Sequence, residues 1–148
     1  MLETQITTKF RIYRSAKEVF EAIVDPEKIG NFWFSSSSER WEEGKMITLR
    51  YEEYDAEGII NVIEIDRNKK IVFKWGAEHD NETIVTITIN ELEKMNTIIE
   101  ISESGFKEED PEVVNMMTDQ KGGWVYMLSC LKSYLENDVK NLRASLVH

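Results

Sequence analysis

The chain has 148 residues, of which 41% are hydrophobic and 31% charged, a composition typical of a folded globular protein. Its 28 acidic and 18 basic residues give a formal net charge of -10, which disfavours binding to nucleic acid or to anionic lipid surfaces. The length, with no linker, repeat or low-complexity tract, predicts one domain over residues 1–148.

Cysteine usage and the N-terminal residues bear on compartment and cofactors. Cys130 is the only cysteine, so no intrachain disulfide is possible, and no mixed cysteine and histidine cluster predicts a metal site. We therefore expect neither a metal nor another cofactor. The first residues lack a basic start followed by an apolar run, and no apolar stretch approaches the ~20 residues that a membrane span needs. We expect a cytoplasmic protein without a membrane span.

The first part of the chain predicts a strand and two short helices. Apolar and polar residues alternate from Ile6 to Tyr13, the period of a strand with one buried face. Residues 15–18, Ser-Ala-Lys-Glu, spell a capping box at a helix start. Asp25 followed by Pro26 ends this helix and begins a second one. The serine run at residues 35–38 predicts a solvated loop.

Five further segments predict an antiparallel meander. They are rich in β-branched and aromatic residues and span 46–52, 59–66, 70–75, 84–92 and 97–102. The connections are too short for crossover helices. One face of the predicted strands is largely apolar, whereas the opposite face is mixed and includes Ile60 and Val62. The apolar face comprises Ile47, Leu49, Tyr51, Ile63, Ile65, Ile71, Phe73, Trp75, Val85, Ile87 and Ile89.

A long amphipathic helix is predicted to begin near Trp124 and to cover the apolar face of the sheet. Its apolar stripe recurs at three-and-four spacing and comprises Trp124, Met127, Leu128, Leu131, Leu135, Val139 and Leu142. Met116 and Met117 precede it, close to the glycine pair at 122–123. This stretch is either an adaptable, hinged pocket mouth or a plain loop before the helix.

The order of these elements resembles the helix-grip fold of the birch-pollen allergen and of steroidogenic-acute-regulatory-related lipid-transfer domains. The predicted fold class is thus α+β, with about six to seven antiparallel strands curved around a long C-terminal helix and two short helices after the first strand. Residues 15–33 also resemble the entry motif of homologues of the activator of the ninety-kilodalton heat-shock-protein ATPase. Further matches in family order lie at residues 41–44, 58–65, 71–75, 97–106 and 123–136.

The resemblance implies a cavity between the sheet and the terminal helix, which holds lipids, sterols or polycyclic aromatics in better-understood relatives. Mapped onto this sequence, the expected lining consists of large apolar and aromatic side chains. Ordinary core packing is the competing explanation for each of them. The candidate ligand-binding residues are Phe32, Trp33, Trp41, Leu49, Tyr51, Ile63, Phe73, Trp75, Ile87, Trp124, Met127, Leu128 and Leu131.

No catalytic residues are predicted. The two histidines, His79 and His148, fall in a turn and at the C-terminus, and Cys130 falls in the helix, where a small core residue is expected. Glu64 and Glu100 lie on predicted strands but point away from the helix. A carboxylate or histidine that faces the cavity would favour an enzyme.

Three hypotheses on function stay open. The first is binding of an apolar or polycyclic small molecule, lipid-like, sterol-like or flavonoid- or polyketide-like, as a carrier or sensor. The second is a chaperone-associated interaction domain, with a chaperone ATPase as partner, and the third is a cyclase- or dehydratase-type enzyme. The missing catalytic constellation favours binding without catalysis, and a monomer is favoured.

Overall fold

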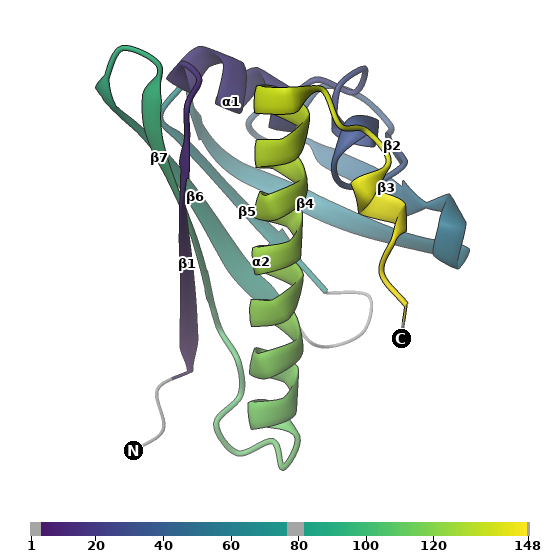
Figure 1. Ribbon diagram of the computed structural model, residues 1–148. Helices are drawn as coiled ribbons and strands as arrows, with labels where there is room; N and C mark the ends of the chain where they lie inside the picture. The colour runs from purple at the N-terminus through teal and green to yellow at the C-terminus, as the bar shows by residue number, and fades with distance from the viewer. Residues whose placement is uncertain (1–3, 77–81, 148) are drawn as a thin grey trace.

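The computed structural model describes residues 4–76 and 82–147 and shows an α+β fold, in which a long helix crosses one face of a curved antiparallel sheet (Figure 1). The two histidines, His79 and His148, lie outside these residues. The main elements are β1 (Gln5–Ile12), α1 (Ala16–Val24), η1 (Ile29–Asn31), β2 (Ser36–Ser37), β3 (Met46–Tyr51), η2 (Glu52–Tyr54), β4 (Ala56–Asp66), β5 (Lys70–Trp75), β6 (Thr83–Glu93), β7 (Asn96–Ser104), α2 (Val113–Asn137) and η4 (Leu142–Ala144).

The sheet has seven strands in the order β1-β7-β6-β5-β4-β3-β2, and each neighbouring pair is antiparallel. The predicted fold class is therefore confirmed. The first helix begins as predicted, because the Ser15 hydroxyl accepts a hydrogen bond from the Glu18 backbone N–H at 3.2 Å. The second short helix is a single 3₁₀ turn, η1. Part of the serine run is not a loop, since Ser36 and Ser37 pair with β3 at the edge of the sheet.

The long helix begins earlier and ends earlier than the sequence pattern indicated. It starts at Val113, so the interpretation of residues 116–123 as a plain loop is wrong. The other interpretation, a pocket mouth, is supported in part, because Met116 lines a pocket but lies within the helix. It ends at Asn137, because Asp138 adopts a left-handed conformation with φ 55° and its backbone N–H bonds back to the Tyr134 carbonyl. Val139 and Leu142 therefore lie beyond the helix, and Val139 is exposed.

The prediction of which β4 side chains point toward the core is wrong over part of the strand. Ile60 and Val62 are buried at 0% and 3% exposure, whereas Ile63 is 42% exposed. A β-bulge between Val62 and Glu64 explains this pattern, because one extra residue shifts the alternation of side chains. Beyond the bulge, Ile65 again packs against the core, as predicted.

The core lies between the sheet, α1 and α2. On β7, alternate side chains face it, namely Thr97, Ile99, Ile101 and then Glu103. The first half of α2 runs beside the lower ends of β1 and β7, and the C-terminal segment returns toward β2 and β3 (Figure 1). This arrangement places the ends of three strands beside the first half of α2, where the candidate site is found.

Candidate functional site

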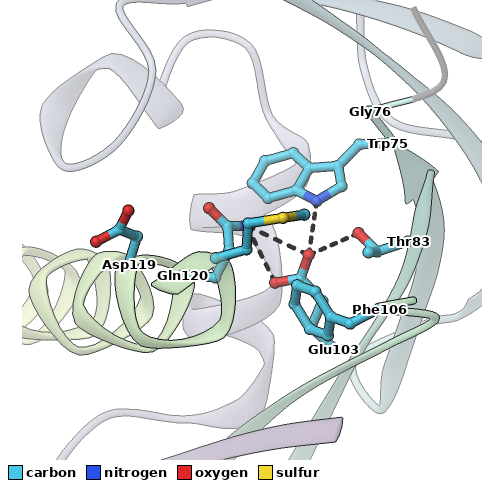
Figure 2. Close-up of a pocket in the computed structure, with 8 residues that line it drawn as sticks. Trp75, Gly76, Thr83, Glu103, Phe106, Asp119 and Gln120 are labelled. Atoms are coloured by element: carbon cyan, nitrogen blue, oxygen red, sulfur yellow. Dashed lines mark hydrogen bonds between the residues drawn. The ribbon is translucent and has the colours of Figure 1, made fainter. Parts of the chain in front are cut away.

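A pocket of about 330 Å³ lies where the ends of β5, β6 and β7 meet the first half of α2 (Figure 2). The sheet register brings these strand ends together, since Trp75 pairs with Thr83 and Val85 pairs with Glu103. We call it the Glu103 pocket. Its lining comprises Trp75, Gly76, Thr83, Glu103, Phe106, Met116, Asp119 and Gln120.

Glu103 is the central polar residue of this pocket and is only 1% exposed. One carboxylate oxygen, Oε1, accepts hydrogen bonds from Trp124 Nε1 at 2.8 Å and from Gln120 Nε2 at 3.1 Å. The other, Oε2, accepts from Thr83 Oγ1 at 2.6 Å, from Trp75 Nε1 at 3.1 Å and from Gln120 Nε2 at 3.2 Å (Figure 2). Two strands and the helix thus supply donors to one buried carboxyl group.

The electrostatic setting of Glu103 is unusual, because all four donors are neutral side chains. A buried carboxylate is costly unless it is well hydrogen-bonded or paired with a cation. Within residues 4–76 and 82–147, no lysine or arginine forms an ion pair with it. An ionised carboxyl accepts hydrogen bonds only, and this donor set fits that form. Glu103 also fixes the indoles of Trp75 and Trp124, which stack at 5.3 Å between ring centroids.

A second, smaller pocket of about 120 Å³ lies between the sheet, α2 and the C-terminal segment. We call it the inner pocket. Trp75 and Gln120 line both pockets, so the two are adjacent. The inner pocket brings together six of the predicted ligand-binding residues, namely Phe32, Trp33, Tyr51, Trp75, Trp124 and Met127.

The remaining predicted ligand-binding residues lie elsewhere. Six of them are at most 1% exposed in the continuous core and line neither pocket, namely Trp41, Leu49, Phe73, Ile87, Leu128 and Leu131. Trp41 instead borders a separate depression beside Phe20 and Arg40. Ile63 points to solvent, because the β-bulge in β4 shifts the alternation of side chains.

Other sequence-based expectations concern polar groups and the cysteine. Glu64 and Glu100 point away from the core, as predicted; Glu100 pairs with Lys9 at 3.2 Å. Cys130 is a buried core residue, also as predicted, and burial raises the pKa of its thiol. Among the described residues, no group of three or more histidines, cysteines or carboxylates is placed to hold a metal ion.

Glu103 is the functional candidate that the sequence pattern missed. The predicted strand ended at residue 102, so Glu103 was assigned to no face. The structure extends β7 to Ser104. The signal was present, because Glu103 continues the period of two set by Ile99 and Ile101.

The C-terminal segment closes the inner pocket and was also missed. Arg143 is 6% exposed and donates to the Trp33 carbonyl at 2.6 Å and to both oxygens of Glu53 at 2.6 and 2.9 Å. The hydrogen bonds from Arg143 hold the pKa of Glu53 down at about 2. Burial raises the pKa of neighbouring Tyr51 to about 12, although the Arg143 charge opposes this shift. We call the hydrogen bonds from Arg143 to Trp33 and Glu53 the Arg143 latch. The apolar spacing predicts a helix as far as Leu142, so a non-helical segment that makes these bonds was not predicted.

The sequence matches the family described as Activator of Hsp90 ATPase homolog 1-like protein over residues 14–136. The chain belongs to this family. No curated protein sequence matches it. The family assignment confirms the resemblance carried by the entry motif and the ordered matches along the chain.

Several solved structures share this fold and superpose closely on this chain. Protein SSP2350 from Staphylococcus saprophyticus is 51% identical, with a TM-score of 0.80 over 92% of this chain and 94% of that one. The Aha1 dimer from Colwellia psychrerythraea is 18% identical, with a TM-score of 0.78 over 91% of this chain and 98% of that one. DynU16, from the dynemicin biosynthetic locus, is 19% identical, with a TM-score of 0.79 over 94% of this chain and 49% of that one.

At 18% and 19% identity, the last two structures show the shared fold alone. No helix within the described part of this family member is long and apolar enough to cross a membrane.

Proposed function

We propose that this protein binds a planar, apolar small molecule of the polycyclic kind, as a carrier or sensor. The observation that carries the proposal is the Glu103 pocket, in which Trp75, Phe106 and Met116 accompany one buried, fully hydrogen-bonded carboxyl group. Its volume of about 330 Å³ falls within the range of small-molecule sites, roughly 300 to 1,000 Å³. Phe106 and Trp75 both line this pocket and offer apolar contact to a flat ring, and the adjacent inner pocket offers room for an extension.

An enzyme of the cyclase or dehydratase type is the second candidate, and Glu103 is the observation that favours it. A general base needs a free lone pair within reach of the substrate proton. The oxygens of Glu103 already accept from four donors, which fill the roughly four acceptor positions of a carboxylate. This donor set supports a carboxyl group that orients side chains and ligand, and it places binding ahead of catalysis.

The family description also makes a chaperone ATPase a candidate partner, and the related structure from Colwellia is described as a dimer. We rank small-molecule binding first, because the described pocket supplies a concrete site for it. The proposal includes a monomer in a reducing, cytoplasmic setting, which suits a chain whose lone Cys130 is buried and free.

A pocket-blocking substitution tests the proposed function. Met116 lines the Glu103 pocket, and the next residue, Met117, lines a separate, more open depression between α2 and β1 with Ile6 and Val114. Met116→Trp fills the pocket, whereas Met117→Trp adds the same bulk outside it. The two variants therefore form a matched pair.

The probe is 2-naphthylmethanol, a neutral two-ring aromatic alcohol, and binding is measured by isothermal titration calorimetry. We expect Met116→Trp to weaken binding by about tenfold or more, a loss of roughly 1.4 kcal/mol, and Met117→Trp to leave it within about twofold. Equal affinity of both variants and the unmodified protein would place the ligand elsewhere. Steady-state turnover of a cyclisable polyketide-like substrate, lost in Glu103→Gln, would instead favour the enzyme.

A further inference from the structure

The charge balance of the Glu103 pocket indicates which polycyclic ligands it selects. Two carboxyl groups line it, Glu103 at its base and Asp119 on α2, and its lining includes no lysine, arginine or histidine among the described residues. The chain as a whole carries a formal net charge of -10. A ligand with a carboxylate or phosphate would therefore enter a field of its own sign.

Gln120 and Trp75 make the longest hydrogen bonds to Glu103. The Gln120 amide nitrogen is shared between both carboxylate oxygens at 3.1 and 3.2 Å, and Trp75 Nε1 donates at 3.1 Å, while Trp124 and Thr83 make shorter hydrogen bonds at 2.8 and 2.6 Å. Trp75 is held in place by stacking on Trp124, whereas Gln120 has no ring that could stack in this way. Gln120 is also half-buried, at the edge of both pockets, whereas Trp124 and Thr83 are buried. A side chain on the exposed edge of a helix moves aside at little cost, so Gln120 is the donor that a ligand replaces.

An ammonium group satisfies this position better than an amide does. It brings three donors, and its positive charge gives buried Glu103 the cationic partner that the described residues do not provide. Charge-assisted hydrogen bonds are roughly twice as strong as neutral ones. Trp75 and Phe106 line the pocket beside the carboxyl group. These two aromatic side chains offer apolar contact to a flat ring that carries the ammonium.

We infer that the Glu103 pocket is selective for planar aromatic ligands that carry a protonated amine, with the ammonium taking the place of the Gln120 amide on Glu103. This inference rests on the proposed small-molecule binding and names the ligand class. Neutral polycycles bind more weakly, and acidic ones such as aromatic carboxylates or fatty acids are rejected.

Three naphthalene probes that differ in one substituent test this selectivity. They are 2-naphthylmethylamine, 2-naphthylmethanol and 2-naphthoate, which at pH 7 are cationic, neutral and anionic. By calorimetry we expect the amine to bind about tenfold more tightly than the alcohol, and the carboxylate to bind most weakly. If no probe binds, the proposed function itself fails. If the alcohol or the carboxylate binds as tightly as the amine, the proposed function stands and the selectivity is refuted.

Matched variants separate a local contact from general electrostatics. Glu103→Gln and Glu100→Gln remove the same charge from the same strand, but Glu100 points outward. We expect the tenfold preference for the amine to shrink to about onefold in Glu103→Gln and to persist in Glu100→Gln. An equal reduction in both variants would refute the direct contact. A circular dichroism spectrum and a cooperative urea unfolding transition like those of the unmodified protein show that Glu103→Gln is folded.

Substitutions at Gln120 keep the inference testable if Glu103→Gln does not fold, because Gln120 lies at the helix edge. Gln120→Lys supplies an ammonium from the protein itself, and we expect it to weaken binding of the amine by about tenfold relative to Gln120→Ala. Gln120→Ala frees the acceptor position and should bind the amine at least as tightly as the unmodified protein. Equal affinity of the lysine and alanine variants for the amine would overturn the replacement of Gln120.

Discussion

Removal of the Glu103 carboxyl group should cost more stability than removal of Glu100, the other carboxylate on β7. In Glu103→Ala, four donors lose their acceptor. The donors on Trp75 and Gln120 are half-buried and can turn to water, whereas those on Thr83 and Trp124 are 5% and 3% exposed. Each buried donor left unpaired costs about 1 to 3 kcal/mol. The substitution also removes the free-energy cost of burying a carboxylate, which offsets part of this destabilisation. We therefore expect a net loss of ~2 to 4 kcal/mol in the free energy of unfolding.

The assay is urea unfolding followed by circular dichroism, with Glu100→Ala as the control. Glu100 lies on the same strand and faces outward in an ion pair with Lys9, so its removal should cost no more than ~0.5 kcal/mol. Trp124→Phe sharpens the test. Alone it should destabilise the protein, but in the Glu103→Ala background it should restore stability, because it removes a donor that has no acceptor.

The reasoning would be refuted by two results. One is a free energy of unfolding for Glu103→Ala that lies within ~0.5 kcal/mol of the Glu100→Ala value. The other is the same loss from Trp124→Phe in both backgrounds, which would mean that Trp124 and Glu103 are not coupled.

Three further predictions follow from the packing and the latch. Arg143→Ala should destabilise the protein by ~1 to 3 kcal/mol at pH 7. The pKa of Glu53 falls from 4.5 to about 2 on folding, so this difference should shrink as pH falls from about 4.5 to about 2, and a constant difference in urea unfolding would contradict the latch. Leu128→Ala should cost ~2 to 5 kcal/mol without altering probe affinity, whereas Met127→Ala should alter affinity; equal behaviour in calorimetry would mean that the inner pocket takes no ligand. Cys130 should react with a thiol reagent such as dithionitrobenzoate only as fast as the protein unfolds, and rapid labelling of the folded protein would show that Cys130 is accessible.

Much of the sheet could be predicted because its strands alternate and its hairpins are short. The apolar residues of β5 and β6 that were expected to face the helix do pack against the core, from Ile71 and Phe73 to Ile89. Ile63 could not be placed correctly, since a bulge adds one residue to β4 without any mark in a pattern of consecutive apolar residues.

The helix boundaries were harder to predict, because each end depends on tertiary structure. The first half of α2 is largely exposed, so it carries little apolar periodicity, and Gly122 and Gly123 lie within it despite their weak helix propensity. At the other end, Asp138 breaks the helix while Leu142 continues its apolar spacing. The hydrogen bonds of the Arg143 latch could not be predicted from helical spacing, because Arg143 lies beyond this break.

The candidate site was predicted in part for the same reasons. Large aromatic residues such as Trp75 and Trp124 could be proposed as a lining from their type and face. Their partner Glu103 was not proposed, because the predicted strand stopped one residue before it, although Glu103 continues the alternation of Ile99 and Ile101. A glutamate is rarely buried, so its residue type argued against the inward face that the structure gives it.

The indole N–H resonances of the four tryptophans offer the most direct test of the central claim that an aromatic ligand binds in the Glu103 pocket. In a ¹H–¹⁵N spectrum recorded during titration with 2-naphthylmethanol, we predict large shifts for Trp75 and Trp124, which donate to Glu103. The resonance of Trp41, which borders a separate depression, should stay in place. Shifts confined to Trp41, or no shift in any of the four, would contradict the account.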